Sequence, residues 1–187
     1  MFIPKKNGGV RFVTDFRKLN LQIQRHPYPL PDVKDVLRRM EGFTHATCLD
    51  VNMGYYHTLL NKHSQEICSI ILPWGKYCYT RLPQGLNCSP DVFQERIDSI
   101  FSDMENIFCY IDNILVVTHK GFDDHMNYLE EVLQRLRLHN IQVHIEETFL
   151  AAQHFDYLGY RLTPDGIKPQ EKKIKAILNI AQPSNIR

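Results

Sequence analysis

Two β-rich apolar runs in the second half of the chain meet at a short polar pair, and this arrangement limits the fold more than any other feature of the sequence. Residues 107–111 and 114–118 are rich in the β-branched and aromatic side chains typical of strands, and only Asp112 and Asn113 separate them. A two-residue connection joins antiparallel strands, because parallel strands need a much longer crossover. The sequence therefore predicts a hairpin that turns at Asp112 and Asn113 and presents a carboxylate.

A second aspartate stands at the end of an earlier apolar run. Residues 46–51 predict a buried strand, and Asp50 lies close to its end. Side chains at strand ends project from a rigid sheet edge, where an unpaired carboxylate is costly unless it binds a cation. Asp50 and Asp112 brought together in this way would form the oxygen-rich site that Mg²⁺ prefers. A single aspartate at a strand end is more often a turn or cap residue, so the prediction depends on the surrounding motifs.

Helices and strands are expected on both sides of these aspartates. A basic hairpin turning at residues 7–9 is expected first, followed by a helix capped by Asp32. Ser89 is the predicted cap of a helix that extends to about residue 104. A long amphipathic helix beginning near Asp123 should bury Met126, Leu129, Leu133 and Leu136. Further strands are expected at residues 67–73, 76–82, 141–145 and 155–162, and a last helix at 170–181. This order predicts an α+β fold, with helices covering one face of an antiparallel sheet.

The charge is unevenly distributed along the chain. Residues 1–40 carry nine Lys and Arg against three Asp, residues 41–160 carry seven against sixteen Asp and Glu, and residues 161–187 carry six against two. Basic ends around an acidic middle suit a protein that grips phosphates at its flanks and holds cations at its centre. A solvated surface of uneven charge gives the same counts and, on this feature alone, is the better explanation.

Composition excludes several classes of protein. The chain is 43% hydrophobic and 23% charged, as is usual for globular proteins. We expect no membrane partner and no secretion, because there is neither a long apolar run nor a signal-like N-terminus. A cytoplasmic or nuclear protein is therefore expected. The five cysteines form no C-x-x-C pair, which argues against a zinc site and favours buried free thiols.

Five segments resemble reverse transcriptase motifs and occur in that family's order. Tyr110-Ile111-Asp112-Asn113 resembles the tyrosine-x-Asp-Asp box, and residues 49–57 resemble the first aspartate motif, with an aromatic residue five positions after the aspartate. Residues 82–86, followed by Ser89-Pro90 and Phe93-Gln94, are similar to the segment between them. Residues 4–11 and 15–20 resemble the fingers motif. Residues 157–160 and 165–169 resemble the primer-gripping turn and thumb entrance of gypsy-type LTR elements.

The resemblance, which covers essentially the whole chain, implies the reverse transcriptase domain of a gypsy-type LTR retrotransposon Pol polyprotein. It implies the right-hand polymerase fold, with fingers at residues 1–45 and a palm at 46–160. A fingers segment around 62–84 would be inserted into the palm, and 161–187 would begin the thumb or connection. Implied partners are an RNA or DNA template with its primer, deoxynucleoside triphosphates, and the RNase H and integrase regions of the polyprotein. The implied location is the cytoplasm, in a virus-like particle, or the nucleus.

The resemblance also implies RNA-directed DNA synthesis with two Mg²⁺ ions, or with Mn²⁺. The implied catalytic residues are Asp50, Asp112 and Asn113, and Asp50, Asp112 and the Val51 backbone would hold the metal ions. The implied nucleotide-binding residues are Lys5, Lys6, Arg11, Tyr55, Gln84 and Gly85. Among these, Tyr55 would lie under the sugar and exclude a 2′-hydroxyl. The implied primer grip consists of Phe155, Tyr157, Leu158 and Gly159.

Two positions depart from the family pattern. Asn113 stands where the family has a second aspartate, so it keeps an oxygen ligand but loses a full charge. Glu147 aligns with a lysine that protonates the departing pyrophosphate in relatives, and His144 is a nearby substitute. An alternative function is therefore a catalytically decayed remnant that still binds nucleic acid. A viral RNA-dependent RNA polymerase is disfavoured, because Tyr55 occupies the room that a 2′-hydroxyl needs.

Overall fold

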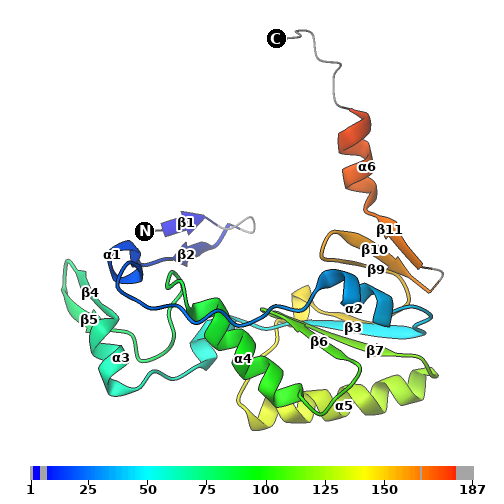
Figure 1. Cartoon of the computed structure of the whole chain (residues 1–187), viewed down its shortest axis with the longest axis horizontal. Coiled ribbons are helices and arrows are strands. Elements are labelled where there is room, and N and C mark those ends of the chain that lie inside the picture. Colours follow the sequence, from blue (N-terminus) through cyan, green and yellow to red (C-terminus); the bar gives the residue numbers. More distant parts are fainter. Residues whose placement is uncertain (1, 5–7, 165, 180–187) are drawn as a thin grey trace.

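The predicted hairpin forms part of a four-stranded antiparallel sheet at the centre of the molecule (Figure 1). The computed structural model describes residues 2–4, 8–164 and 166–179. The strand order is β6 (Ile107–Tyr110), β7 (Asn113–Thr118), β3 (His45–Asp50) and β8 (Phe149–Ala152). Each of the six residues of β3 is paired with a residue of β7. The two central strands are therefore held in one register along their whole length.

Two helices cover one face of this sheet, as the sequence predicts. Helices α4 (Ser89–Phe101) and α5 (Phe122–Leu138) pack on Leu49, Ile114 and Val116, and Phe93 and Val132 are fully buried between them. Burial of such side chains contributes about 1.5–3 kcal/mol each. The α+β class is confirmed, with α4 and α5 as the helical layer.

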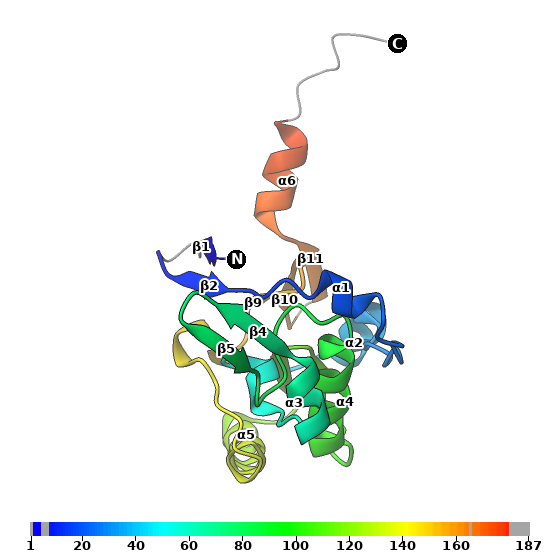
Figure 2. The same cartoon turned by 90° about the vertical axis from the view of Figure 1, so that its left-hand side faces the viewer.

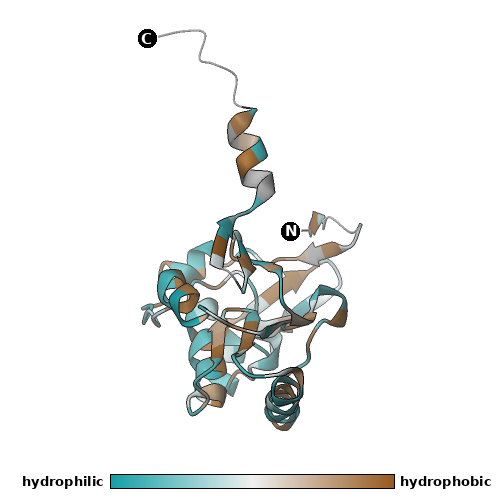
Figure 3. Ribbon diagram, turned by 90° about the vertical axis from the view of Figure 1, so that its right-hand side faces the viewer, coloured by the Kyte–Doolittle hydropathy of each residue, from teal (hydrophilic) through white to brown (hydrophobic). Residues whose placement is uncertain are grey.

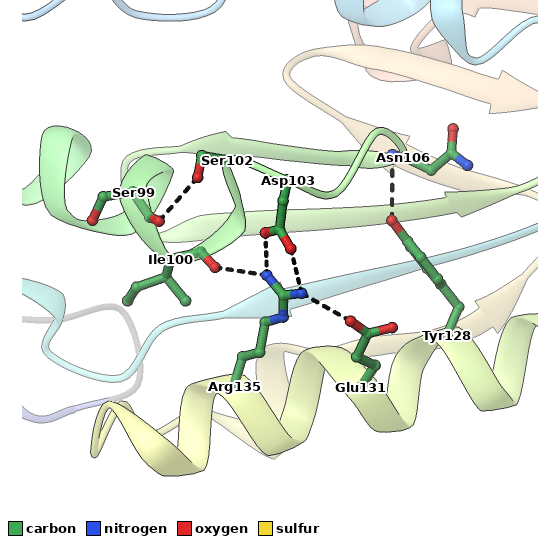
Figure 4. Close-up of polar contacts among 8 residues, drawn as sticks. All are labelled: Ser99, Ile100, Ser102, Asp103, Asn106, Tyr128, Glu131 and Arg135. Carbon is green, nitrogen blue, oxygen red and sulfur yellow. Dashed lines mark hydrogen bonds and ion pairs between the residues drawn. The ribbon is translucent and has the colours of Figure 1, made fainter.

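An ion-pair cluster fixes α5 against the end of α4 (Figure 4). The Arg135 guanidinium of α5 contacts both carboxylate oxygens of Asp103, with 2.8 Å between Nη2 and Oδ2. It also donates to the carbonyl of Ile100 over 3.1 Å and to Glu131 over 2.9 Å. The Tyr128 hydroxyl accepts from the backbone amide of Asn106, the residue before β6. These contacts connect the long helix to the segment that enters the hairpin.

The opposite face of the sheet is also covered. Helix α2 (Val33–Arg39) and a second sheet, in the order β11 (Gly166–Pro169), β10 (Tyr160–Thr163) and β9 (Phe155–Tyr157), pack on Cys48, Leu115 and Val117. Strand β7 is thus buried on both faces, which explains why its sequence is apolar without alternation. Beyond this sheet, α6 (Glu171–Leu178) stands away from the body (Figure 3).

Segments far apart in the sequence lie together at the other end of the molecule (Figure 2). They comprise the hairpin of β1 (Phe2–Pro4) and β2 (Val10–Phe12), α1 (Arg17–Asn20), α3 (Lys62–Ile67), and the hairpin of β4 (Ser69–Leu72) and β5 (Gly75–Cys78). Phe16 packs with Cys68, Leu82 and Leu86 in a core of its own. Residues 62–84 therefore pack with the N-terminal segment, as the expected fingers insertion requires, while the domain boundaries themselves stay predictions.

Several local predictions were wrong. Residues 141–145 form no strand apart from one bridge between Val143 and Val51, and β8 lies later in the chain. Residues 155–162 form two strands rather than one. Met126 and Leu133 are each 41% exposed, so α5 buries a narrower face than expected. All five cysteines are free, as predicted, but only Cys48, Cys68 and Cys109 are buried. Among the helices that the structure describes, none is both long enough and apolar enough to span a membrane.

Candidate active site

The structure brings Asp50, Asp112 and Asn113 to one edge of the central sheet. Asp50, the last residue of β3, is paired across the strands with Asn113, the first residue of β7. Asp112 directly precedes Asn113, and its carbonyl accepts a hydrogen bond from the Val51 amide over 2.7 Å. The strand register alone therefore places both predicted carboxylates, with the backbone of Val51, in one small region.

The hairpin turns one residue earlier than the sequence predicts. Tyr110 pairs with Asn113, so Ile111 and Asp112 form the turn. Ile111 has a φ of 52°, in the left-handed region that β-branched residues rarely adopt. Such a conformation costs on the order of 1–3 kcal/mol and persists only where neighbouring contacts impose it. Asp112 is thus presented from a strained turn.

The surroundings of Asp50 disfavour its ionised form. Burial raises the pKa of Asp50 to about 6, and the Asp112 and Glu147 carboxylates add to the rise, whereas His144 opposes it. The His144 amide also donates to the Asp50 carbonyl over 2.7 Å. Within the described part of the chain, no three His, Cys, Asp or Glu side chains could hold a metal ion by themselves. Two carboxylates together with substrate phosphates are, however, a usual ligand set for Mg²⁺.

A cleft of about 900 Å³ opens at this edge. Its walls come from the N-terminal hairpin, the segment after β3 and the hairpin of β6 and β7. They include the sequence-predicted residues Asp50, Val51, Tyr55, Gln84, Asp112 and Glu147. The hairpin of β1 and β2 contributes Ile3, Pro4, Val10 and Phe12. The cleft is large enough for a nucleotide-sized ligand.

Tyr55 is held beside the aspartates by a short helix. It lies in the 3₁₀ helix Gly54–His57, and its ring packs edge-on against Phe93 with 5.7 Å between centroids. Burial raises the pKa of Tyr55, and Asp112 adds to this rise. Sequence reasoning missed the importance of Gly54. A Cβ at this position would lie 2.8 Å from Cζ of Phe93. Only glycine lets the Tyr55 segment pack this closely on α4.

Gly85 makes a close approach of a different kind from the one expected. Its φ is 105°, and an added Cβ would lie 2.9 Å from the carbonyl oxygen of Thr14. Asn20 donates to the Gly85 carbonyl over 2.9 Å. The neighbour that requires glycine here is therefore the chain's own N-terminal segment, and a nucleotide contact at Gly85 stays a prediction.

Two of the four residues expected to form the primer grip are buried in the core. Phe155 and Tyr157 are 3% and 4% exposed, and Phe155 packs on Phe43. The apolar core between the two sheets holds both side chains, and their role in a primer grip stays a prediction. Leu158 and Gly159 form the turn between β9 and β10, with φ values of 45° and 87°. Their role in the grip likewise stays a prediction.

The basic residues expected to bind phosphates are only partly described. Lys5 and Lys6 lie outside the described residues. Arg11 lies in β2, opposite Ile3, and its side chain is likewise outside the described part. Their role in binding phosphates therefore stays a prediction.

Gln94 is the second residue that sequence reasoning missed. It is fully buried in α4 and hydrogen-bonds the backbone of the β6–β7 hairpin at Cys109 and Ile111. The available signal was a polar side chain at position 94 on the apolar helix face formed by Phe93, Ile97 and Phe101. Such a residue needs partners in the core.

Comparison with known proteins gives a consistent result. A family model described as reverse transcriptase (RNA-dependent DNA polymerase) matches residues 3–162. The Transposon Tf2-7 and Tf2-3 polyproteins of Schizosaccharomyces pombe (strain 972 / ATCC 24843) are each 29% identical over 187 residues, which cover 99% of this chain and 14% of the relative.

Solved structures with the same fold include two foamy viral protease-reverse transcriptases. One, the dRH form in complex with double-stranded DNA, has a TM-score of 0.89 at 24% identity over 97% of this chain and 32% of that one. The other, in complex with an RNA/DNA hybrid, has a TM-score of 0.84 at 24% identity over 97% of this chain and 24% of that one.

Proposed function

Because the chain belongs to the reverse transcriptase (RNA-dependent DNA polymerase) family, we propose that it is the polymerase domain of an LTR retrotransposon polyprotein and synthesises DNA in the cleft at Asp50 and Asp112. The observation that carries the proposal is the hairpin that brings Asp112 beside Asp50, inside the region that the family model matches. The chain spans 14% of the length of the transposon polyproteins it resembles, so a whole polyprotein's activity and partners belong to the proposal.

The two carboxylates are suited to divalent cations, and we assign to them two Mg²⁺ ions, with Mn²⁺ as the alternative. The raised pKa of Asp50 supports this assignment, because burial and, after it, the neighbouring carboxylates disfavour the ionised form, and a bound cation would offset both effects. Asp50 and Asp112 would supply carboxylate oxygens, Val51 its carbonyl, and a triphosphate the remaining ligands. When bound, such ions activate the primer 3′-hydroxyl and neutralise charge on the leaving pyrophosphate.

The remaining residues of the cleft would position the nucleotide. Tyr55 would pack against the sugar, and Phe93 behind it limits how far the ring can retreat from a 2′-hydroxyl. Gln84, which also lines the cleft, would contact the nucleotide. Lys5, Lys6 and Arg11 would bind the triphosphate, since cationic side chains on a nearby hairpin suit phosphate oxygens.

The partners follow from the same assignment. The foamy viral structures bind double-stranded DNA and an RNA/DNA hybrid, which supports a primed RNA or DNA template as the partner of this chain. We assign deoxynucleoside triphosphates as substrates and the rest of a Pol polyprotein, with RNase H and integrase, as its covalent context. We place the activity in cytoplasmic virus-like particles or in the nucleus.

Primer extension on an RNA template with a DNA primer tests the proposal, in Mg²⁺ and separately in Mn²⁺. We expect the native chain to extend the primer and Asn113→Asp to extend it faster, because the second carboxylate strengthens metal binding. Asp112→Ala should abolish extension. Asp124→Ala, which changes an exposed aspartate in the first turn of α5, is the matched control and should retain activity.

The variant Asn113→Asp with Glu147→Lys separates two causes of weak activity. Extension only by the restored variants would show that the metal site of this chain has decayed while its fold is intact. If no variant extends although all bind the primer–template, the polymerase proposal fails and a nucleic-acid-binding remnant takes its place.

A further inference from the structure

Gln94 has all of its amide hydrogen bonds inside the protein. Its Oε1 accepts from the Ile111 amide over 2.7 Å, and its Nε2 donates to the Cys109 carbonyl over 2.8 Å and to Oδ1 of Asp98 over 2.9 Å. Both amide hydrogens and one acceptor site are therefore used. Rotating the amide by half a turn would bring two donors together at Ile111 and two acceptors together at Cys109. The orientation of the Gln94 amide is thus fixed by its partners.

The backbone groups that Gln94 binds surround the strained turn of the catalytic hairpin. Cys109 lies near the end of β6, and Ile111 has its φ of 52° immediately before Asp112. On the other side of the turn, the Val51 amide donates to the Asp112 carbonyl over 2.7 Å. The turn is therefore held from both sides, by β3 and by α4. Only contacts of this kind keep a β-branched residue in the left-handed region.

Gln94 is separated from the reacting groups. It is 0% exposed, it is not among the residues that line the cleft, and it reaches Asp112 only through the backbone of Ile111. Its position in α4 is fixed by the fully buried neighbours Phe93 and Ile97. A group in this place can transmit the rigidity of the helix to the hairpin, but it cannot contact substrate.

From these contacts we infer that Gln94 is a positioning residue that sets the place of the Asp112 carboxylate in the cleft by holding the Ile111 amide. The inference rests on the proposed function, because it gives the position of Asp112 a catalytic consequence. It separates the role of Gln94 from that of its apolar neighbours, which stabilise the fold without directing the turn.

The first test removes all three hydrogen bonds of the Gln94 amide and nearly preserves the side-chain volume. In Gln94→Met, the Ile111 amide loses its acceptor, so its hydrogen exchange in the substrate-free protein should become faster. The rate constant kcat for primer extension should fall about tenfold to a hundredfold with little change in KM for the nucleotide, because a displaced carboxylate harms the reaction more than binding. Gln65→Met is the matched control, since Gln65 donates to the Leu60 carbonyl at a distance from the hairpin, and it should change neither quantity.

The second test uses the conservative variant Gln94→Glu. A protonated carboxyl group can accept from Ile111 and donate to Cys109, whereas an ionised one cannot donate. The titratable groups facing this position are Asp98, the Tyr28 hydroxyl bonded to Asp98, and the Cys109 thiol. The ratio of kcat in Gln94→Glu to kcat in the parent should therefore be highest at low pH and fall as the pH rises. A residue with only a packing role would give a ratio that does not depend on pH.

The outcomes separate this inference from the proposed function. Unchanged exchange at Ile111 in Gln94→Met, or faster exchange with an unchanged kcat, would overturn the positioning role. The activity measurements use the native chain, Asn113→Asp, and Asn113→Asp with Glu147→Lys as parents. If none of these parents extends a primer, the proposed function fails, and exchange at Ile111 still decides whether Gln94 holds the turn.

Discussion

The Asn113 side chain donates a hydrogen bond to the Asp112 carboxylate, with 3.1 Å between Nδ2 and Oδ1. Its Oδ1 faces the Cys48 thiol at 3.8 Å. An amide at this position therefore partly offsets the charge of Asp112, whereas an aspartate would add a further negative charge beside Asp50 and Asp112. Without a bound cation, the site of this chain therefore has less electrostatic repulsion than a site with three carboxylates would have.

Asn113→Asp should therefore reduce the stability of the metal-free protein. We expect a loss of about 1–2 kcal/mol in EDTA, because a hydrogen bond to a charged group is replaced by repulsion. Added Mg²⁺ should reverse this loss and raise the melting temperature of the variant more than that of the native chain. Thermal unfolding with and without Mg²⁺ measures both effects. A variant that is equally stable in EDTA would contradict the role assigned to the amide.

Asp50→Asn should increase the stability of the metal-free protein at neutral pH. The folded-state pKa of Asp50 is raised from 3.8 to about 6, so the folded protein binds this proton more tightly than the unfolded chain does. Its contribution to stability is thus greatest below pH 3.8 and is lost as the pH rises through 6. The gain at neutral pH should be on the order of 1 kcal/mol, because solvent screens a half-buried group.

Unfolding in EDTA at pH values below and above 6 tests this prediction. The difference in stability between native chain and variant should be small at the lower pH and larger at the higher one. The same difference at both pH values would mean that Asp50 does not titrate as its surroundings indicate.

The sequence predicts the parts of the site that depend on local patterns. The runs before Asp50 and Asp112 are apolar and β-rich, so both strands and their approximate ends follow from propensity. Ser89-Pro90 correctly indicates the start of α4, although Cys88 occupies the cap position and the Ser89 hydroxyl donates to the Pro83 carbonyl instead.

Tertiary contacts decide the parts that the sequence does not predict. The turn is displaced to Ile111 because Gln94 and Val51 hold a conformation that isoleucine disfavours by itself. Strand β8 was missed because it lies at the edge of the sheet and leaves Phe149 and Leu150 exposed, which hides the usual alternation. The burial of Tyr157 depends on a second sheet packing over the first, which no local pattern specifies.

Gly54→Ala should destabilise the protein and displace Tyr55. The new methyl group would meet the Phe93 ring, which is fully buried and cannot move freely. Overpacking of this kind costs about 1–3 kcal/mol. The KM for the nucleotide should rise as well, because Tyr55 follows Gly54 directly and lines the cleft. Chemical denaturation and primer extension measure the two effects.

The control for this variant is Gly121→Ala, where nothing lies within 4 Å of the added Cβ and φ is −71°. It should lower the stability by at most about 1 kcal/mol, because alanine is a weaker helix cap than glycine. Adding Phe93→Leu to Gly54→Ala should recover part of the loss, since a smaller side chain relieves the contact. Purely additive losses would show that the ring is not the obstacle.

Asp91→Ala should release the segment between α1 and α2 from α4. The Asp91 side chain, only 7% exposed, accepts from the Arg25 guanidinium over 2.6 and 3.0 Å and from the Tyr28 amide over 3.1 Å. The bond with Arg25 lowers the pKa of Asp91, so its contribution to stability is present above pH 3.8 and is lost in acid. We expect a loss of about 1–3 kcal/mol at neutral pH, because two charge-assisted partners lose their acceptor.

Limited proteolysis distinguishes release of this segment from general unfolding. Cleavage of Asp91→Ala should concentrate within residues 21–31, whereas a globally unstable protein is cut throughout. Asp35→Ala, which breaks an exposed pair with Arg38, should leave both stability and the cleavage pattern nearly unchanged. Asp91 and Gln94 lie on the same helix but bind different segments of the chain. Release of the segment at Asp91 should therefore leave the hairpin in place, and hydrogen exchange at Ile111 should stay at its native rate.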